Sequence, residues 1–412
     1  MATVSVASLR ALRPADAPVY LTGAAAVTSV VSIAACQTLM ALAVLALIFT
    51  HAKFRLPPLW LPLSLFVLGT LISLADSGHI RSGLPQVKKF YVYLMLFLVV
   101  SALRNVRQVR GVASGWALAA TLSAVWSLFQ FARKYEDAQR AHQNFYASYV
   151  GRRITGFMSH WMTFSGEMMM TLLVIAAIVF FSMDRRWTGA LIGAGALVSV
   201  ALAASFTRSM WLGTAGGAVY LIWFWRRWLV LALPAVVGLL LLANPFEVRD
   251  RVMSAFRPHG EVDSNEHRVV TRLVGWEMIK AHPWLGVGPE QVGPQFNQYI
   301  PDNVGLPLPI GYYGHLHNIY VHYAAERGVP TMLVLMWMLG RALFDFLRAL
   351  RRLPIAAEER WVLHAAVAVT IAVLIGGFYE LNLGDSEVLS MFLAVAGCGY
   401  VAAEKGDEKC KA

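Results

Sequence analysis

Three histidines near residue 320 could carry chemistry in one of three ways. His315 and His317 are separated only by Leu316, and His322 follows five residues later. A neutral imidazole accepts a proton near pH 7, so His317 could act as a general base. A structural hydrogen bond to a nearby carbonyl is an equally ordinary role, and zinc binding is a third. The spacing does not place all three rings on one helix face, and no Cys, Asp or Glu lies beside them, so we predict no metal site. The base and structural roles stay open.

Two arginines are suited to hold an anion. Arg208 follows Ser205-Phe206-Thr207 at the end of an apolar segment, and Arg272 lies in a long polar segment, four residues after Arg268. A guanidinium stays charged and offers a fork of donors that matches phosphate. Arg208 and Arg272 together could neutralise a pyrophosphate without a metal ion. The alternative is that Arg208 only extends its charge to the membrane edge and that the loop arginines only solvate the surface.

The elements that must position these residues are membrane helices. The chain has 412 residues, of which 58% are hydrophobic and 14% charged, and its mean hydropathy is +0.56. Soluble chains carry about 25% charged residues, whereas apolar runs of roughly 17–25 residues, typical of transmembrane helices, recur here. The alternating pattern of a barrel is absent, so the expected fold class is an all-α polytopic membrane protein. The net charge of +11 lies mostly in short loops, which favours a role in topology over nucleic-acid binding.

The number of spans depends on one ambiguous stretch, residues 18–49, which is long for one helix and short for two. Two helices put the Lys- and Arg-rich short loops and both termini on one side, the cytoplasmic side under the positive-inside rule. This gives about twelve spans, against about eleven for a single helix. The other spans are expected, to within about three residues, at 56–75, 87–102, 112–131, 161–182, 187–204, 210–225, 228–244, 329–347, 361–379 and 386–403.

A long outward loop separates two groups of spans. We expect transmembrane helices in residues 1–244, a periplasmic loop domain with the candidate base in 245–327, and transmembrane helices with a cytoplasmic tail in 328–412. Many arginines fall on this outer side, against the sorting rule, which suggests that they hold an anion.

Helical signals divide this loop. Asp263-Ser264-Asn265-Glu266 predicts a helix start, and Pro283 predicts its end. The helical stripe between them consists of Val269, Leu273, Trp276 and Ile279. The Gly- and Pro-rich segment 286–314 is predicted to be irregular, and Asn318 is expected to cap a short helix over 319–326.

Several signals of other chemistry are missing. The chain has no GxxxxGK[ST], and Gly286-Val287-Gly288-Pro289 lacks the third glycine of a dinucleotide fingerprint. No cofactor is therefore expected. Glu167 and Glu380 are the acids nearest to a span interior, where acids are functional by default, although both could lie near the outer surface.

Three stretches in this order resemble the O-antigen ligase and polymerase superfamily of bacterial membrane glycosyltransferases, and its ligase branch in particular. They are Thr207-Arg208-Ser209-x-Trp211-Leu212-Gly213, Arg272-x-x-x-Trp276-x-x-Ile279-x-x-His282-Pro283-x-x-Gly286-x-Gly288, and His317-Asn318 followed after nine residues by Gly328-x-x-Thr331. Arg152-Arg153-x-x-Gly156-Phe157 is similar more weakly. The likeness runs from about residue 80 to 400.

This resemblance implies a GT-C-like fold of about twelve transmembrane helices in the bacterial inner membrane, with the active site facing the periplasm. The donor would be an O-antigen glycan on undecaprenyl pyrophosphate, and the acceptor a sugar hydroxyl of lipid A–core. The reaction would be inverting and need neither metal nor nucleotide. Membrane lipids and other envelope glycan assembly proteins would be partners.

The same resemblance assigns roles to residues. His317 would be the catalytic base, and Arg208 and Arg272 would bind the donor pyrophosphate. Arg268 is a second choice beside Arg272, which has the better spacing to Trp276. Secondary candidates are Arg152, Arg153, His315 and Asn318.

Other functions stay possible at this point. A polymerase would use the same donor with a growing glycan as acceptor, and a protein O-oligosaccharyltransferase would use a protein. A lipid-linked glycan or solute transporter would show internal repeats and polar groups at the membrane midplane. The chain shows neither clearly.

Overall fold

The computed structural model describes residues 14–244, 247–256 and 265–411, and these residues form helices and loops without any strand. The all-α fold class is confirmed to that extent. The proposed helix start at Asp263 and Ser264 lies outside the described residues; the helix itself is present from Asn265.

The first half of the chain contains the elements η1 (Pro14–Asp16), α1 (Ala17–Thr28), α2 (Ile33–Phe49), α3 (Trp60–Asp76), α4 (Ile80–Lys88), η2 (Lys89–Tyr93), α5 (Leu94–Ala102), α6 (Val106–Arg140), α7 (Phe145–Val150), α8 (Trp161–Phe181) and α9 (Thr188–Ala204). The second half contains α10 (Arg208–Arg226), η3 (Arg227–Ala232), α11 (Leu233–Ala243), α12 (Val248–Met253), α13 (Asn265–Ala281), α14 (Val292–Gln295), η6 (Phe296–Tyr299), α15 (Ile319–Arg327), α16 (Val329–Arg352), α17 (Glu359–Gly376), η7 (Asn382–Gly384) and α18 (Ser386–Lys411).

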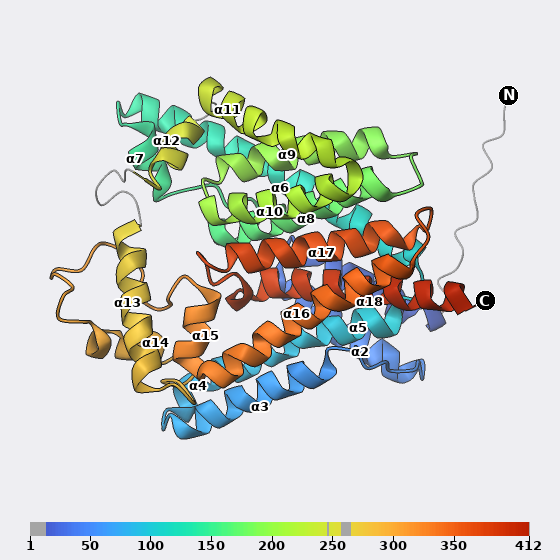
Figure 1. The fold of residues 1–412 in the computed structure, drawn as a ribbon, viewed down its shortest axis with the longest axis horizontal. Coiled ribbons are helices and arrows are strands. Elements are labelled where there is room, and N and C mark those ends of the chain that lie inside the picture. The colour runs from blue at the N-terminus through green and yellow to red at the C-terminus, as the bar shows by residue number, and fades with distance from the viewer. Residues whose placement is uncertain (1–13, 245–246, 257–264, 412) are drawn as a thin grey trace.

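Most long helices run side by side along the long axis of the molecule, whereas α13 lies across that direction at one end, with α14 and α15 beside it (Figure 1). The helix α18 ends at the opposite end of the bundle. The centre of the bundle is formed by α17 and α18. In the most apolar 18-residue stretch of each helix, 78% and 83% of the residues are buried. Because other helices cover most of their surface, this pair forms the core on which the rest packs.

Within the part of the chain that the structure describes, six helical segments are long and apolar enough to cross a membrane: 80–102, 106–140, 161–181, 208–243, 359–376 and 386–406. The expected count of twelve spans and the GT-C class stay predictions. Residues 18–49 do form two helices, α1 and α2, which pack together. However, α1 has 12 residues, or about 18 Å of helix, which is shorter than a hydrocarbon core of about 30 Å.

The expected break between spans 210–225 and 228–244 is present: α10 ends at Arg226, and the 3-10 element η3 separates it from α11. By length and composition, residues 208–243 nevertheless form one of the six apolar segments. Arg226 and Arg227, which suggested a loop, are compatible with this turn because both side chains are exposed.

Small residues bring α10 and α17 into close contact. Gly213 and Gly217 lie one turn apart, and a Cβ at either would be 2.7 Å from the carbonyl oxygen of Ala372 or 2.9 Å from that of Ala368. Spacing of small residues by four lets helix backbones approach in membranes. This contact holds the helix that begins with Arg208 against the central α17.

We therefore expect Gly217→Ala to lower the melting temperature of the purified protein, because the added methyl overpacks the α10–α17 contact at a cost of about 1–3 kcal/mol. Gly193→Ala is the matched control, since nothing lies within 4 Å of a Cβ there and alanine favours a helix over glycine by about 1 kcal/mol. Thermal unfolding in detergent measures both. Equal melting temperatures for the two variants would show that the contact is loose.

A second, smaller core lies under α13. Val270, Val274 and Met278 pack with residues of the following loop and with Leu316 and Ala325. The stripe that marked this helix in the sequence lies on the other side: Val269, Leu273 and Trp276 are exposed. Both residues 269 and 270 and both residues 273 and 274 are apolar, so the sequence allows either of two faces of α13 to be buried. Contact with α15 decides which face it is.

Candidate active site

His317 lies immediately before α15, in a backbone conformation that few side chains adopt. Its φ is +48°, in the left-handed region, which costs a residue other than glycine about 1–3 kcal/mol and persists only where the surroundings impose it. Asn318 provides that support. Its side-chain oxygen accepts hydrogen bonds from the backbone of Tyr320 (2.9 Å) and Val321 (3.0 Å), as expected of an N-cap, and its amide donates to the carbonyl of Phe378 (3.0 Å).

The two ring nitrogens of His317 have different surroundings. Nδ1 lies 3.2 Å from Oε2 of Glu380, whereas Nε2 is buried and has no hydrogen-bond partner among the described residues. An ionised carboxylate only accepts hydrogen bonds, so Nδ1 must donate and a neutral ring keeps its lone pair on Nε2. The ring is therefore oriented with a proton-accepting nitrogen free.

Glu380, in the turn between α17 and α18, is the residue that orients this ring. It is buried, and it also forms an ion pair with Arg268. Burial alone would raise the pKa of Glu380, but the charge of Arg268 and the hydrogen bond from His317 outweigh it and lower the pKa to about 2. The carboxylate stays ionised at neutral pH and would stabilise a protonated His317, as the buried acid does in a catalytic triad.

The low pKa of Glu380 gives a pH-dependent prediction. Its ordinary value is 4.5, so its contribution to stability is fully present above about pH 4.5 and is lost as the pH falls toward about 2. We expect the melting temperature of the protein to fall more steeply between pH 5 and pH 3 than that of Glu380→Gln. Parallel melting curves for the two proteins would show that the ion pair with Arg268 contributes nothing.

Neighbouring histidines surround the base without adding charge. The ring of His315 lies 4.2 Å from that of His317, and the ring of His267 lies 5.1 Å from it. Burial, aided by the charge of a protonated His317, lowers the pKa of His267 to about 4 and that of His315 to about 3. Within the described residues no group of His, Cys, Asp or Glu is arranged to hold a metal ion.

Arg268 reaches the site from the first turn of α13. One of its terminal nitrogens pairs with Glu380, while its Nε is buried and has no hydrogen-bond partner among the described residues. Arg268 and His317 therefore contact opposite oxygens of the same carboxylate, and each presents one unsatisfied polar atom. Such atoms are rare in folded proteins and indicate that a further group completes them.

Three more arginines lie around the start of α13. Arg208, the first residue of α10, donates to Ser254 (3.0 Å) and to Asn265 (2.5 Å), which is one turn before Arg268. Arg251 is buried and donates to the carbonyl of Phe206 (2.9 Å). Arg153 is close enough that, after burial, the charges of Arg251 and Arg268 lower its pKa. Like charges gathered in a poorly hydrated place form a site for an anion.

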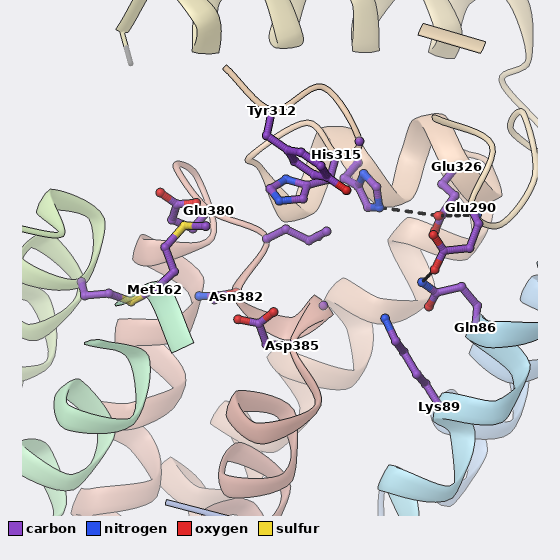
Figure 2. A pocket seen from close by; sticks show the side chains of 15 residues that line it. Gln86, Lys89, Met162, Glu290, Tyr312, His315, Glu326, Glu380, Asn382 and Asp385 are labelled. Carbon is purple, nitrogen blue, oxygen red and sulfur yellow. Dashed lines mark hydrogen bonds and ion pairs between the residues drawn. The ribbon is translucent and has the colours of Figure 1, made fainter. Parts of the chain in front are cut away.

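A polar cavity of about 190 Å³ is lined in part by Glu380 (Figure 2). Its wall includes His315 and Glu380, which both contact His317, together with Lys89 and Asp385, which point toward its middle. The hydroxyl of Thr163 donates to Asp385 at 2.9 Å. Burial raises the pKa of Asp385, partly offset by this hydrogen bond and by the charge of Lys89.

Comparison with known families decides the relationship. Residues 193–336 match the family model described as O-antigen ligase, a range that includes Arg208, Arg268 and His317. This match supports a relationship of the chain to the O-antigen ligase and polymerase superfamily. No curated protein matches it. The family points to a membrane glycosyltransferase-like enzyme.

Several parts of the site lie outside the range that matches this superfamily. Glu380, Arg153, Lys89 and Asp385 all fall before residue 193 or after residue 336. Sequence reasoning noted Glu380 as an acid near a span but gave it no role, and it counted Arg251 only among the outer arginines. Nothing local connects Glu380 to His317, which precedes it by 63 residues.

Not every residue suggested by the superfamily motifs joins the cluster. Arg272 is exposed, one turn beyond Arg268 on α13, and Arg152 is exposed beside the half-buried Arg153. Arg272 as the main pyrophosphate ligand stays a prediction from the motif. His315 contacts the base, and Asn318 supports the backbone that presents it.

Proposed function

We propose that this protein is an O-antigen ligase, which transfers a glycan from undecaprenyl pyrophosphate to a sugar hydroxyl of lipid A–core. The observation that carries the proposal is the pair of unsatisfied atoms, Nε2 of His317 and Nε of Arg268, on either side of Glu380. A hydroxyl donating to the first and a phosphate oxygen accepting from the second would satisfy both. The arginines and the base would face the periplasm from the inner membrane.

The proposed reaction is a direct displacement. Nε2 of His317 accepts the proton of the acceptor hydroxyl as its oxygen forms a bond to the anomeric carbon of the donor. The bond from that carbon to the phosphate oxygen breaks, and its electron pair leaves with the pyrophosphate. Attack from the opposite side inverts the anomeric centre. Glu380 stabilises the protonated His317 until the proton is released.

The arginines would stabilise the leaving group. Its negative charge grows as the bond to the sugar breaks, and fixed cations in a poorly hydrated site lower the energy of that state most effectively. Arg268 is placed to contact a phosphate next to the base, and Arg153, Arg208 and Arg251 contribute further positive charge. This set makes pyrophosphate departure possible without a metal ion or a nucleotide.

Reconstitution tests the function. Purified protein is mixed with lipid-linked O-antigen, with and without lipid A–core, in the absence of ATP and in the presence of a chelator. Glycan transfer to lipid A–core is the expected result. Extension of the lipid-linked glycan instead would identify a polymerase, transfer to an added acceptor protein would identify a protein O-oligosaccharyltransferase, and movement of the donor across vesicles without transfer would identify a transporter.

A further inference from the structure

The cavity beside Glu380 has no role in the reaction as described so far. Segments far apart in the chain form it: Gln86 and Lys89 at the junction of α4 and η2, Glu290 in the loop after α13, Glu326 on α15, and Asp385 before α18. Its volume of about 190 Å³ is below the roughly 300–1,000 Å³ of pockets for drug-sized ligands. It therefore has room for one small polar ring.

One wall of the cavity is a network whose charges are already paired. Glu326 is contacted by Arg327 at 3.0 Å and by His322 at 3.6 Å, and it accepts a hydrogen bond from the backbone of Glu290 at 2.9 Å. The side chain of Gln86 donates to Glu290 at 2.5 Å. Since each of these groups is held by another, the wall is a rigid surface of hydrogen-bonding groups.

Two polar atoms in the lining have no partner. Nδ1 of His322 and Oδ1 of Asn382 belong to side chains that are more than nine-tenths buried, and neither atom has a hydrogen-bond partner among the described residues. Lys89 and Asp385 point into the space between the paired wall and Glu380 (Figure 2). Unsatisfied atoms, an ammonium and a carboxylate around one cavity indicate a ligand with several hydroxyl groups.

We propose that this cavity binds one sugar ring of the acceptor, an inference that rests on the proposed function. Four carboxylates, Glu290, Glu326, Glu380 and Asp385, line it with Lys89 as the one lysine, so a phosphate would be repelled while hydroxyl groups would find acceptors. Arg268 pairs with Glu380 but does not line the cavity. Glu380 thus connects a cationic part of the site, for the donor pyrophosphate, with a carboxylate-lined part for the acceptor sugar.

The position of the cavity suits this role. His315 and Glu380 line it, and both contact His317, one by its ring at 4.2 Å and the other by a hydrogen bond at 3.2 Å. A sugar held by Lys89 and Asp385 would therefore be separated from His317 only by the side chains of His315 and Glu380. Binding in this place would orient one hydroxyl of the sugar toward Nε2 of His317. The acceptor would then be held in the geometry needed to attack the donor.

Lys89→Met and Asp385→Asn test the proposal, with Lys88→Met as the matched control because Lys88 is the exposed neighbour of Lys89. The probe is a labelled core oligosaccharide without acyl chains, and its binding to each full-length protein is measured by equilibrium dialysis. We expect Kd to rise tenfold or more in the two cavity variants, because each loses a charged hydrogen bond, and to stay at the wild-type value in Lys88→Met. In the transfer assay, KM for the acceptor should rise and KM for the donor should not.

The outcomes separate this proposal from the proposed function. Equal binding by all four proteins, or no binding by the wild type, would overturn the acceptor site even if glycan transfer is observed. Binding that depends on Lys89 and Asp385 without any glycan transfer would keep the sugar site and reject the ligase. If Asp385→Asn fails to fold, as judged by gel filtration and melting temperature, Lys89→Met alone decides.

Discussion

Replacement of His317 is expected to lower kcat for glycan transfer by about 10²–10⁴-fold, the usual contribution of a general base. Nε2 of this ring is the unpartnered proton acceptor in the cluster, and Glu380 fixes the tautomer that exposes it. Loss of the ring should leave donor binding nearly unchanged, since the arginines remain. The effect should therefore appear in kcat and not in KM for the donor.

Two variants make this result interpretable. His317→Ala places a residue with a Cβ and no polar group at a φ of +48°, so it removes the base and can also destabilise the fold. His317→Asn tolerates this backbone region better and cannot accept the proton effectively. His282→Ala is the control, because His282 is exposed and its side chain contacts the hydroxyl of Tyr299, away from His317. Full activity of His317→Asn would reject the base assignment.

Arg268→Met is expected to reduce kcat/KM by about 10²–10³-fold, the typical cost of removing one charged donor that stabilises a developing anion. Arg272→Met, one turn further along the exposed surface of α13, should stay close to wild type. The comparison uses the same substitution on the same helix, so general effects of losing an arginine cancel. The measurement is the initial rate of transfer at several donor concentrations.

A larger loss in Arg272→Met than in Arg268→Met would identify Arg272 as the main pyrophosphate ligand, as its spacing to Trp276 suggests, and would reject Arg268. One complication is that Arg268→Met leaves the buried Glu380 with only His317 as a partner, and an unpaired buried charge is costly. The double variant Arg268→Met/Glu380→Gln removes both charges and is compared with the single variant Glu380→Gln. If both are folded and the double variant is slower than Glu380→Gln, the additional loss belongs to Arg268 in catalysis and not to misfolding.

Local signals were sufficient for several elements. Asn318 caps α15 as expected because a capping side chain and the helix it begins lie next to each other in the chain. The helix over Asn265–Ala281 was also predictable, since its apolar periodicity and the following Pro283 are local. Its buried face was not predictable, because neighbouring apolar positions offered two faces and only contact with α15 distinguishes them.

The choice between Arg268 and Arg272 shows the same limit. Residues four apart lie on nearly the same side of a helix, about 6 Å apart along its axis. Sequence spacing cannot tell which turn will lie opposite Glu380. The position of α13 across the end of the bundle places the first turn there, so Arg268 pairs with Glu380 and Arg272 is exposed.

The sequence by itself indicated that this chain is an all-helical membrane protein, that it resembles the O-antigen ligase and polymerase superfamily, and that His317 and several arginines are its chemical candidates. These conclusions depend on composition, periodicity and short motifs, which are properties of neighbouring residues. Only the tertiary structure decided that Glu380 joins His317 to Arg268, and that Lys89 and Asp385 line a cavity beside them. The contacts of Glu380 connect residues 63 and 112 positions apart in the chain. Packing of α17 and α18 at the centre of the bundle, rather than any local pattern, brings these segments together.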